Sequence, residues 1–138
     1  MGFSLIELLI VVVIFSIIMT LSVGGYRQSV LRTNRSDATS ALLRIAAAQE
    51  RHYLDNNQYA ASLAELGIPG TSERGYYQLT IQARDPVTGY QAAARVDADT
   101  RQRADHECRA FTIDQSGLRG ARSAGDLSPA AATERCWR

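Results

Sequence analysis

The stretch that decides the fold is Phe3–Val23, FSLIELLIVVVIFSIIMTLSV, in which Glu7 is the only ionisable side chain. Its 21 residues would form a helix about 31 Å long. That length matches the roughly 30 Å hydrocarbon core of a bilayer. A cleaved secretory signal is a poorer interpretation, because the apolar stretch is too long and no small-residue cleavage site follows it. The pattern therefore predicts a helix that spans or inserts into a membrane.

The length of the chain is that of one domain, and its amino-acid composition is that of an ordinary globular protein. Of its 138 residues, 46% are apolar and 21% are charged, and the formal net charge is +1. All 15 basic residues are arginine, which excludes mechanisms that need a lysine Schiff base or a P-loop lysine. The GxGxxG, GxSxG and CxxC motifs are also absent from the sequence. We therefore expect no enzyme activity and no cofactor.

Two adjacent glycines, Gly24 and Gly25, follow the apolar stretch. Together they cost a helix about 1–2 kcal/mol relative to alanine, so they predict a bend or a melted segment, with a plain linker as the alternative. Beyond them, residues 26–54 carry a stripe at spacings of three and four, which predicts an amphipathic helix that covers a sheet. The stripe consists of Ala38, Ala41, Leu42, Ile45, Ala48, Gln49 and Tyr53. Charged side chains of this segment, including Arg35 and Asp37, are expected to face solvent.

The second half of the chain contains short strand patterns separated by turn signals. Residues 55–75 are predicted to form a loop, and the sheet is predicted within residues 76–114. The strand patterns cover residues 77–82, 90–96 and 111–114. A long helix followed by an antiparallel meander indicates an α+β fold.

The chain has two cysteines, Cys108 and Cys136. If the domain lies beyond a membrane in an oxidising compartment, a disulfide is the favoured interpretation and two free thiols are the alternative. The bond would close a segment of about 29 residues and stabilise the fold by about 3–4 kcal/mol. Asp105, His106 and Glu107 precede Cys108, but two carboxylates with one histidine make a weak metal pattern. We expect no metal.

The segment Gly2–Val13, GFSLIELLIVVV, resembles the class III leader-peptide junction of type IV pilins and type II secretion pseudopilins. The resemblance implies that a prepilin peptidase cuts after Gly2 and N-methylates Phe3. It also implies that Glu7 docks against the N-terminal amine of a neighbouring subunit, which would neutralise both charges inside a filament core. The leader in this family is usually longer and basic. Two readings of its start therefore remain open, a start site further upstream and a shortened leader.

Two further segments are similar to the PilE type of minor pilin. AQERHY at residues 48–53 is similar to an A-Q-E-R-Y-Y segment of that group. The tail is similar to its disulfide-bounded D-region, since TIDQSG at 112–117 lies between Cys108 and CWR at 136–138. The resemblance favours the Cys108–Cys136 bond and spans the whole chain.

The resemblance implies the type IV pilin fold, in which a long N-terminal helix packs on a small antiparallel sheet. Residues 1–2 would be a leader remnant, and residues 3–25 the membrane and filament-core helix. Residues 26–138 would form the globular domain, with the disulfide-bounded region at 108–136. The implied function is that of a minor structural subunit that primes or supports pilus assembly, and so supports twitching motility and adhesion.

The same resemblance implies partners and a location. The partners are other minor and major pilins, the prepilin peptidase, the inner-membrane assembly platform and a tip adhesin. Before assembly the chain would be a single-pass protein of the bacterial inner membrane with a periplasmic globular domain. After assembly it would be part of an extracellular pilus.

Two alternatives remain open. A type II secretion pseudopilin would usually lack the D-region disulfide, and many pseudopilin domains bind calcium. A DNA-binding pilin of a natural-transformation pilus would need uncompensated basic surface, but residues 95–138 hold eight arginines and seven acidic residues. The sequence therefore does not favour a nucleic-acid partner. A fold could still gather on one face four arginines of this segment, Arg119, Arg122, Arg135 and Arg138.

Overall fold

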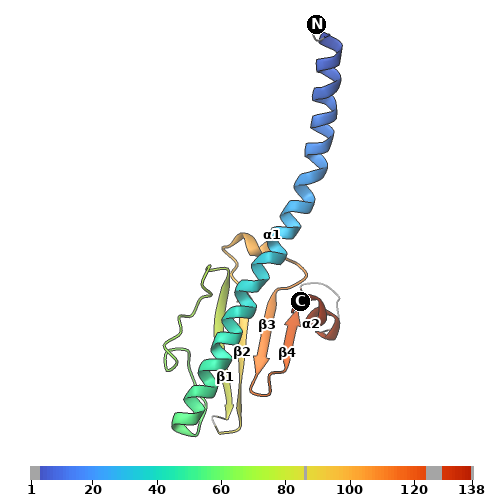
Figure 1. Cartoon of the computed structure of the whole chain (residues 1–138). Coiled ribbons are helices and arrows are strands. Elements are labelled where there is room, and N and C mark those ends of the chain that lie inside the picture. The colour runs from blue at the N-terminus through green and yellow to red at the C-terminus, as the bar shows by residue number, and fades with distance from the viewer. Residues whose placement is uncertain (1–3, 86, 124–128, 138) are drawn as a thin grey trace. The chain divides into compact units, whose positions relative to one another are not determined.

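The computed structural model describes residues 4–85, 87–123 and 129–137. Its elements follow the order α1, β1, β2, η1, β3, β4 and α2 (Figure 1). The chain divides into two compact units, residues 1–33 and 34–138. The first unit contains the N-terminal part of helix α1. The second begins at Asn34 and contains the rest of α1, the sheet and α2. The predicted boundary at residue 26 stays a prediction.

Helix α1 spans Leu5–Asn56 without interruption. It continues through Gly24 and Gly25, so the predicted melted segment is not found. A glycine weakens a helix by only about 1 kcal/mol, which the hydrogen-bonded turns on both sides can outweigh. The predicted bend at these glycines stays a prediction.

The end of α1 has a local cause. Asn57 has a φ of 54°, in the left-handed region that asparagine tolerates better than most residues, and its N–H donates to the Tyr53 carbonyl at 2.8 Å. The loop that follows is held by the buried side chain of Gln49. Its amide donates to the Ala60 carbonyl at 2.9 Å and accepts from the Ala60 N–H at 2.8 Å. The loop is therefore tied back to the helix before the sheet begins.

The sheet has four antiparallel strands in chain order. The strands are β1 (Tyr77–Asp85), β2 (Gly89–Val96), β3 (Ala110–Asp114) and β4 (Arg119–Arg122). Strands β1 to β3 confirm the predicted meander, but the sheet does not end at residue 114 as predicted. Strand β4 has the sequence RGAR, which lacks the β-branched and aromatic residues that signal a strand. The short elements η1 (Arg101–Ala104) and α2 (Pro129–Cys136) were not predicted either.

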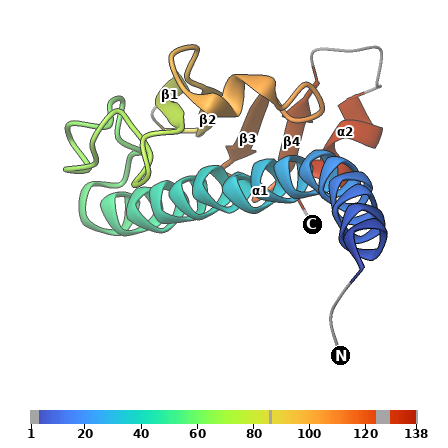
Figure 2. The same ribbon diagram turned by 90° about the horizontal axis from the view of Figure 1, so that it is seen from above.

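The core lies between the second part of α1 and one face of the sheet (Figure 2). The predicted helical stripe is buried there, with Ala48 and Tyr53 half-buried at its margin. Leu42 and Ile45 are fully buried, and each such side chain contributes about 1.5–3 kcal/mol. The sheet contributes mainly the fully buried side chains Tyr77, Ala92, Ala94 and Phe111. This packing confirms the α+β fold.

Candidate functional site

The predicted processing junction, Gly2 and Phe3, lies outside the described residues. Glu7 lies in the first turn of α1 and is exposed. Its carboxylate has no hydrogen bond or ion pair with any residue between 4 and 137 that the structure describes. A negative charge there is favoured by the positive end of the helix dipole. Within the described residues, the Glu7 carboxylate therefore has no cationic partner.

The N-terminal part of α1 presents apolar side chains all round. Its large apolar residues from Leu5 to Met19 are each at least 48% exposed. An 18-residue window of the helix has a mean hydropathy of 2.8, and none of that window is buried. By length and composition the helix can cross a membrane. These apolar side chains would be shielded from water only in lipid or against other apolar helices.

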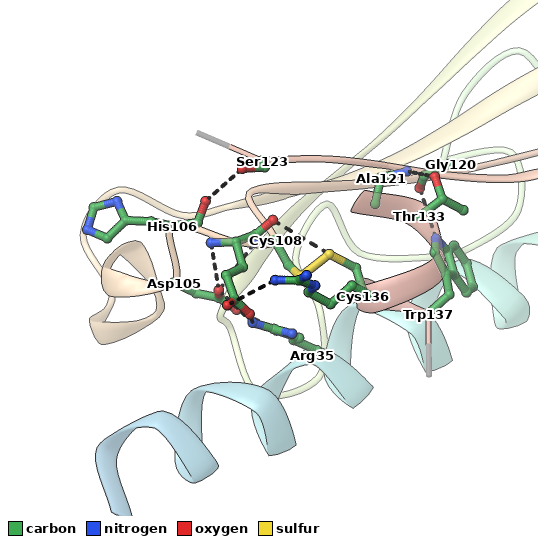
Figure 3. The surroundings of a disulfide bond; sticks show 12 residues. Arg35, Asp105, His106, Cys108, Gly120, Ala121, Ser123, Thr133, Cys136 and Trp137 are labelled. Atoms are coloured by element: carbon green, nitrogen blue, oxygen red, sulfur yellow. Dashed lines mark hydrogen bonds and ion pairs between the residues drawn. A yellow bond between two sulfur atoms is a disulfide. The ribbon is translucent and has the colours of Figure 1, made fainter. Parts of the chain in front are cut away.

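The second predicted feature, the disulfide, is present in the structure (Figure 3). Cys108, just before β3, is bonded to Cys136 at the end of α2, with sulfur atoms 2.01 Å apart. Both cysteines are buried. Trp137 follows, and its ring meets the Phe111 ring edge-on with 6.0 Å between centroids. The C-terminal residues are thus part of the core, as the predicted disulfide-bounded region requires.

A buried ion pair lies beside the disulfide. Arg35 of α1 is only 7% exposed, and its guanidinium faces the loop before Cys108 (Figure 3). Its Nε donates to Oδ2 of Asp105 at 2.7 Å and its Nη2 donates to Oδ1 at 2.9 Å. Nη2 also donates to Oε2 of Glu107 at 3.0 Å. Such a two-bond contact between arginine and a carboxylate is among the stronger hydrogen-bonded arrangements in proteins.

Asp105 is the centre of this arrangement. Besides Arg35, it accepts hydrogen bonds from the Cys108 N–H at 3.2 Å and from Nε2 of Gln102 at 3.1 Å. Burial alone would lower the pKa of the Arg35 guanidinium, but the bonds to Asp105 and Glu107 outweigh it and raise that pKa. The bonds therefore favour the charged guanidinium, and the pair fixes the loop before the disulfide on helix α1.

Two expectations about charged residues were wrong. Arg35 and Asp37 were expected to face solvent, but both are buried. Asp37 accepts a hydrogen bond from the Ser72 hydroxyl at 2.6 Å and one from the Arg74 N–H at 3.2 Å. Arg35 lies three residues before Ala38, at the margin of the buried stripe. That position was the signal in the sequence, but the partners come from distant loops.

The predicted absence of a metal centre concerns the run from Asp105 to Cys108. In the structure the Asp105 and Glu107 carboxylates are engaged with Arg35, and the Cys108 sulfur is in the disulfide. Among the residues that the structure describes, no group of three or more metal-ligating side chains is found. The run thus serves the ion pair and the disulfide.

Arg95 and Arg122 lie in line across the outer face of the sheet, and we call these two residues the arginine row. The sequence did not reveal it. Strand register aligns Arg95 of β2 with Ala110 of β3, and Ala110 with Arg122 of β4. Both arginines are exposed, and neither guanidinium is paired within the described part of the chain. Arg101 and Arg103, in the connection at the same end of the sheet, are also exposed.

The possible grouping of four C-terminal arginines on one face is not found among the three that the structure describes. Arg119 and Arg122 have opposite parity on β4, and Arg119 lies over the Trp137 ring, 5.1 Å from its centroid. Arg135 lies 3.8 Å from Glu107 instead. Arg138 is outside the described residues. The alternation of side chains along a strand places Arg119 and Arg122 on opposite faces of the sheet.

With this geometry in hand, comparison with known proteins identifies the family. Residues 25–112 match the family model described as type IV minor pilin ComP, DNA uptake sequence receptor. That match covers more than half of the chain. The chain belongs to this family of type IV minor pilins. Residues 2–23 of the minor pilin also match the prokaryotic N-terminal methylation motif.

A solved structure agrees with the family. The minor pilin is similar to the high-resolution structure of a type IV pilin from Shewanella oneidensis, with 26% sequence identity and a TM-score of 0.51. The match covers 64% of this chain and 89% of the Shewanella chain. A comparison with curated proteins gives no match. The type IV pilin fold and the minor-pilin family, both predicted from the sequence, are confirmed, and the pilin family is not known to be enzymatic.

Proposed function

We propose that this minor pilin is made as a prepilin, cut after Gly2 and N-methylated on Phe3. Residues 3–25 then hold it in the bacterial inner membrane as a single-pass protein, with the globular domain in the periplasm. The methylation motif at residues 2–23 supports this proposal, as does the exposed apolar surface of α1. The disulfide fits the periplasm, because such bonds persist in oxidising compartments.

In the filament, Glu7 pairs with the N-terminal amine of a neighbouring subunit. The observation that carries this step is one carboxylate on a helix surface that has no other charged side chain from Leu5 to Met19. Burying it in a core of packed helices without a partner would cost several kcal/mol. A pair with a neighbour's amine removes that cost and fixes the axial register of the two subunits.

The proposed role is to prime or support pilus assembly, and through it twitching motility and adhesion. The proposed partners are other minor and major pilins, the prepilin peptidase, the inner-membrane assembly platform and a tip adhesin. Membership of the type IV minor pilin family supports association with pilins and the pilus machinery. The disulfide-bounded region is the structural argument against the pseudopilin alternative, since pseudopilins usually lack it.

The test compares Glu7→Val with Ser16→Ala in the native host. Ser16 is on the same helix and bonds only its own turn, through the Val12 carbonyl, so its loss leaves the apolar surface intact. We expect Glu7→Val to remain in the membrane fraction but to be depleted from sheared filaments. Ser16→Ala should enter filaments normally. Incorporation of Glu7→Val at the wild-type level would refute the docking role.

A second candidate function is DNA binding during uptake, because the matched family model is described as a DNA uptake sequence receptor. The arginine row supports it. Arg95 and Arg122 are two strands apart, which is roughly 10 Å, and both guanidinium groups are open to solvent. Asp97 and Asp99 lie near this end of the sheet and reduce the excess positive charge. Asp105 does not, because Arg35 already neutralises it.

Binding of a short DNA duplex to the full chain in detergent micelles tests this candidate. Fluorescence anisotropy is measured at several salt concentrations for the wild type, for Arg95→Gln/Arg122→Gln, and for Arg44→Gln/Arg51→Gln on the exposed side of α1. Each lost phosphate contact lowers the slope of log affinity against log salt by about 0.9. The row variant should lose about two contacts and the helix variant none. No binding by the wild type at low salt would end this candidate.

A further inference from the structure

Strand β4 is the last strand of the sheet in the described part of the chain. The Asp114 N–H donates to the Leu118 carbonyl, which sets the direction of the backbone groups that follow. Residues 118, 120 and 122 direct theirs toward β3, so Arg119 and Ala121 direct theirs outward. Outward-facing backbone groups on an edge strand are a template on which another strand can pair.

Helix α2 covers this edge with side chains (Figure 3). The outward N–H of Ala121 donates to the Thr133 hydroxyl oxygen at 2.9 Å. The indole N–H of Trp137, just past α2, donates to the Gly120 carbonyl at 2.9 Å. Ala132 of the helix is fully buried. The Thr133 hydroxyl therefore occupies the place that a fifth strand would take, and Trp137 fastens the chain just past α2 to β4.

Helix α2 has only eight residues. An isolated helix of this length is not stable in water, so contacts with the rest of the domain must hold it. Its last residue, Cys136, is bonded to Cys108, just before β3. The disulfide therefore keeps the cover on the edge of the sheet.

We propose that α2 is a disulfide-held cover that prevents β4 from pairing with β4 of a second copy of this chain. Identical strands can pair antiparallel about a two-fold axis. Centring that pairing on Ala121 places Arg119 opposite Ser123 of the second copy, so no arginine directly faces an arginine. The small residues Gly120 and Ala121 leave the second backbone free to approach. The uncovered edge is thus compatible with itself in shape, and the arginines of the two copies are staggered rather than directly opposed.

The test uses the full chain in detergent micelles, with the disulfide intact. Thr133→Val/Trp137→Phe removes the acceptor for Ala121 and the donor to Gly120. Valine keeps the size of the Thr133 side chain, and phenylalanine keeps an aromatic ring at position 137. Thr133→Ser is the matched control, because it retains the hydroxyl. Amide hydrogen exchange at Ala121 is compared with exchange at Ala92 in the central strand β2. Light scattering over a range of protein concentrations reports self-association.

We expect exchange at Ala121 to rise at least tenfold in the double variant while Ala92 is unchanged. We also expect dimers that form with increasing concentration, whereas the wild type and Thr133→Ser remain monomeric. Adding Ala121→Pro, which removes the outward N–H, should abolish the dimers. Unchanged protection at Ala121, a variant that stays monomeric, or dimers that persist with Ala121→Pro would each overturn the proposal.

Discussion

Arg35 and Asp105 are joined by two hydrogen bonds, of 2.7 Å and 2.9 Å, although seventy residues separate them in the chain. Asp105 also accepts the N–H of Cys108, so the ion pair and the disulfide act on the same loop. One side of this loop is fixed to α1 by charge, and the other is fixed to α2 by a covalent bond. The arrangement makes the C-terminal region dependent on both connections.

Removing Arg35 should therefore be costly. Arg35→Met leaves the Asp105 carboxylate buried without its cation, and breaking a buried pair in this way costs about 3 kcal/mol or more. Denaturant unfolding of the chain in micelles, monitored by tryptophan fluorescence, measures this loss. Arg44→Met is the control, because Arg44 is exposed and its loss should change the free energy of unfolding by less than about 0.5 kcal/mol. Equal effects of the two substitutions would contradict the role of the pair.

Removing the disulfide should destabilise the globular domain by about 3–4 kcal/mol, because the unfolded chain regains the freedom of the closed segment. Cys136→Ser should therefore unfold at a lower temperature under oxidising conditions. The wild type with its disulfide reduced should unfold at nearly the same temperature as the variant. An unchanged melting temperature for Cys136→Ser would show that the bond has no stabilising role.

Stability should fall steeply at alkaline pH. Burial raises the pKa of Tyr90 to about 12, and burial with the nearby Asp105 charge raises the pKa of Tyr77 further. A raised folded-state pKa gives stability that is complete below the unfolded value near 10 and is lost as the pH rises through the folded value. The free energy of unfolding should thus decline from pH 10 to pH 12.

The variant Tyr77→Phe should make this decline shallower, because a buried group that ionises on unfolding has been removed. Tyr26→Phe, at an exposed position on α1, should leave the decline unchanged. The measurement is the free energy of unfolding of each protein at several fixed pH values between 8 and 12. A Tyr77→Phe curve parallel to the wild type throughout would contradict this explanation.

The two glycines of α1 give a separate test. Neither has a neighbouring atom within 4 Å of where a Cβ would be, so alanines fit without a clash. Gly24→Ala/Gly25→Ala should stabilise the helix locally by about 1–2 kcal/mol. If the predicted bend is needed for assembly, membrane insertion should be unchanged while incorporation into sheared filaments falls. Full incorporation of the variant would show that the bend is not required.

Local patterns in the sequence predicted the long helix, its buried stripe and three strands, since each follows from a period of 3.6 or 2. Strand β4 was not predicted, because its sequence RGAR has low strand propensity. It forms a strand only by pairing with β3. The partners of Arg35 could not be predicted, because they depend on which distant loop packs against the helix. Charge counted along the chain also missed the alignment of Arg95 and Arg122, which only strand register creates.

The most direct test of the central claim is mass spectrometry of sheared surface filaments from the native host. A processed minor pilin predicts a peptide that begins with N-methylated Phe3, at low abundance beside a dominant pilin. A dominant peptide of this kind would instead make the chain the major subunit. If the chain is present in the inner membrane but missing from the filaments, the claim that it is a structural subunit of the pilus is contradicted.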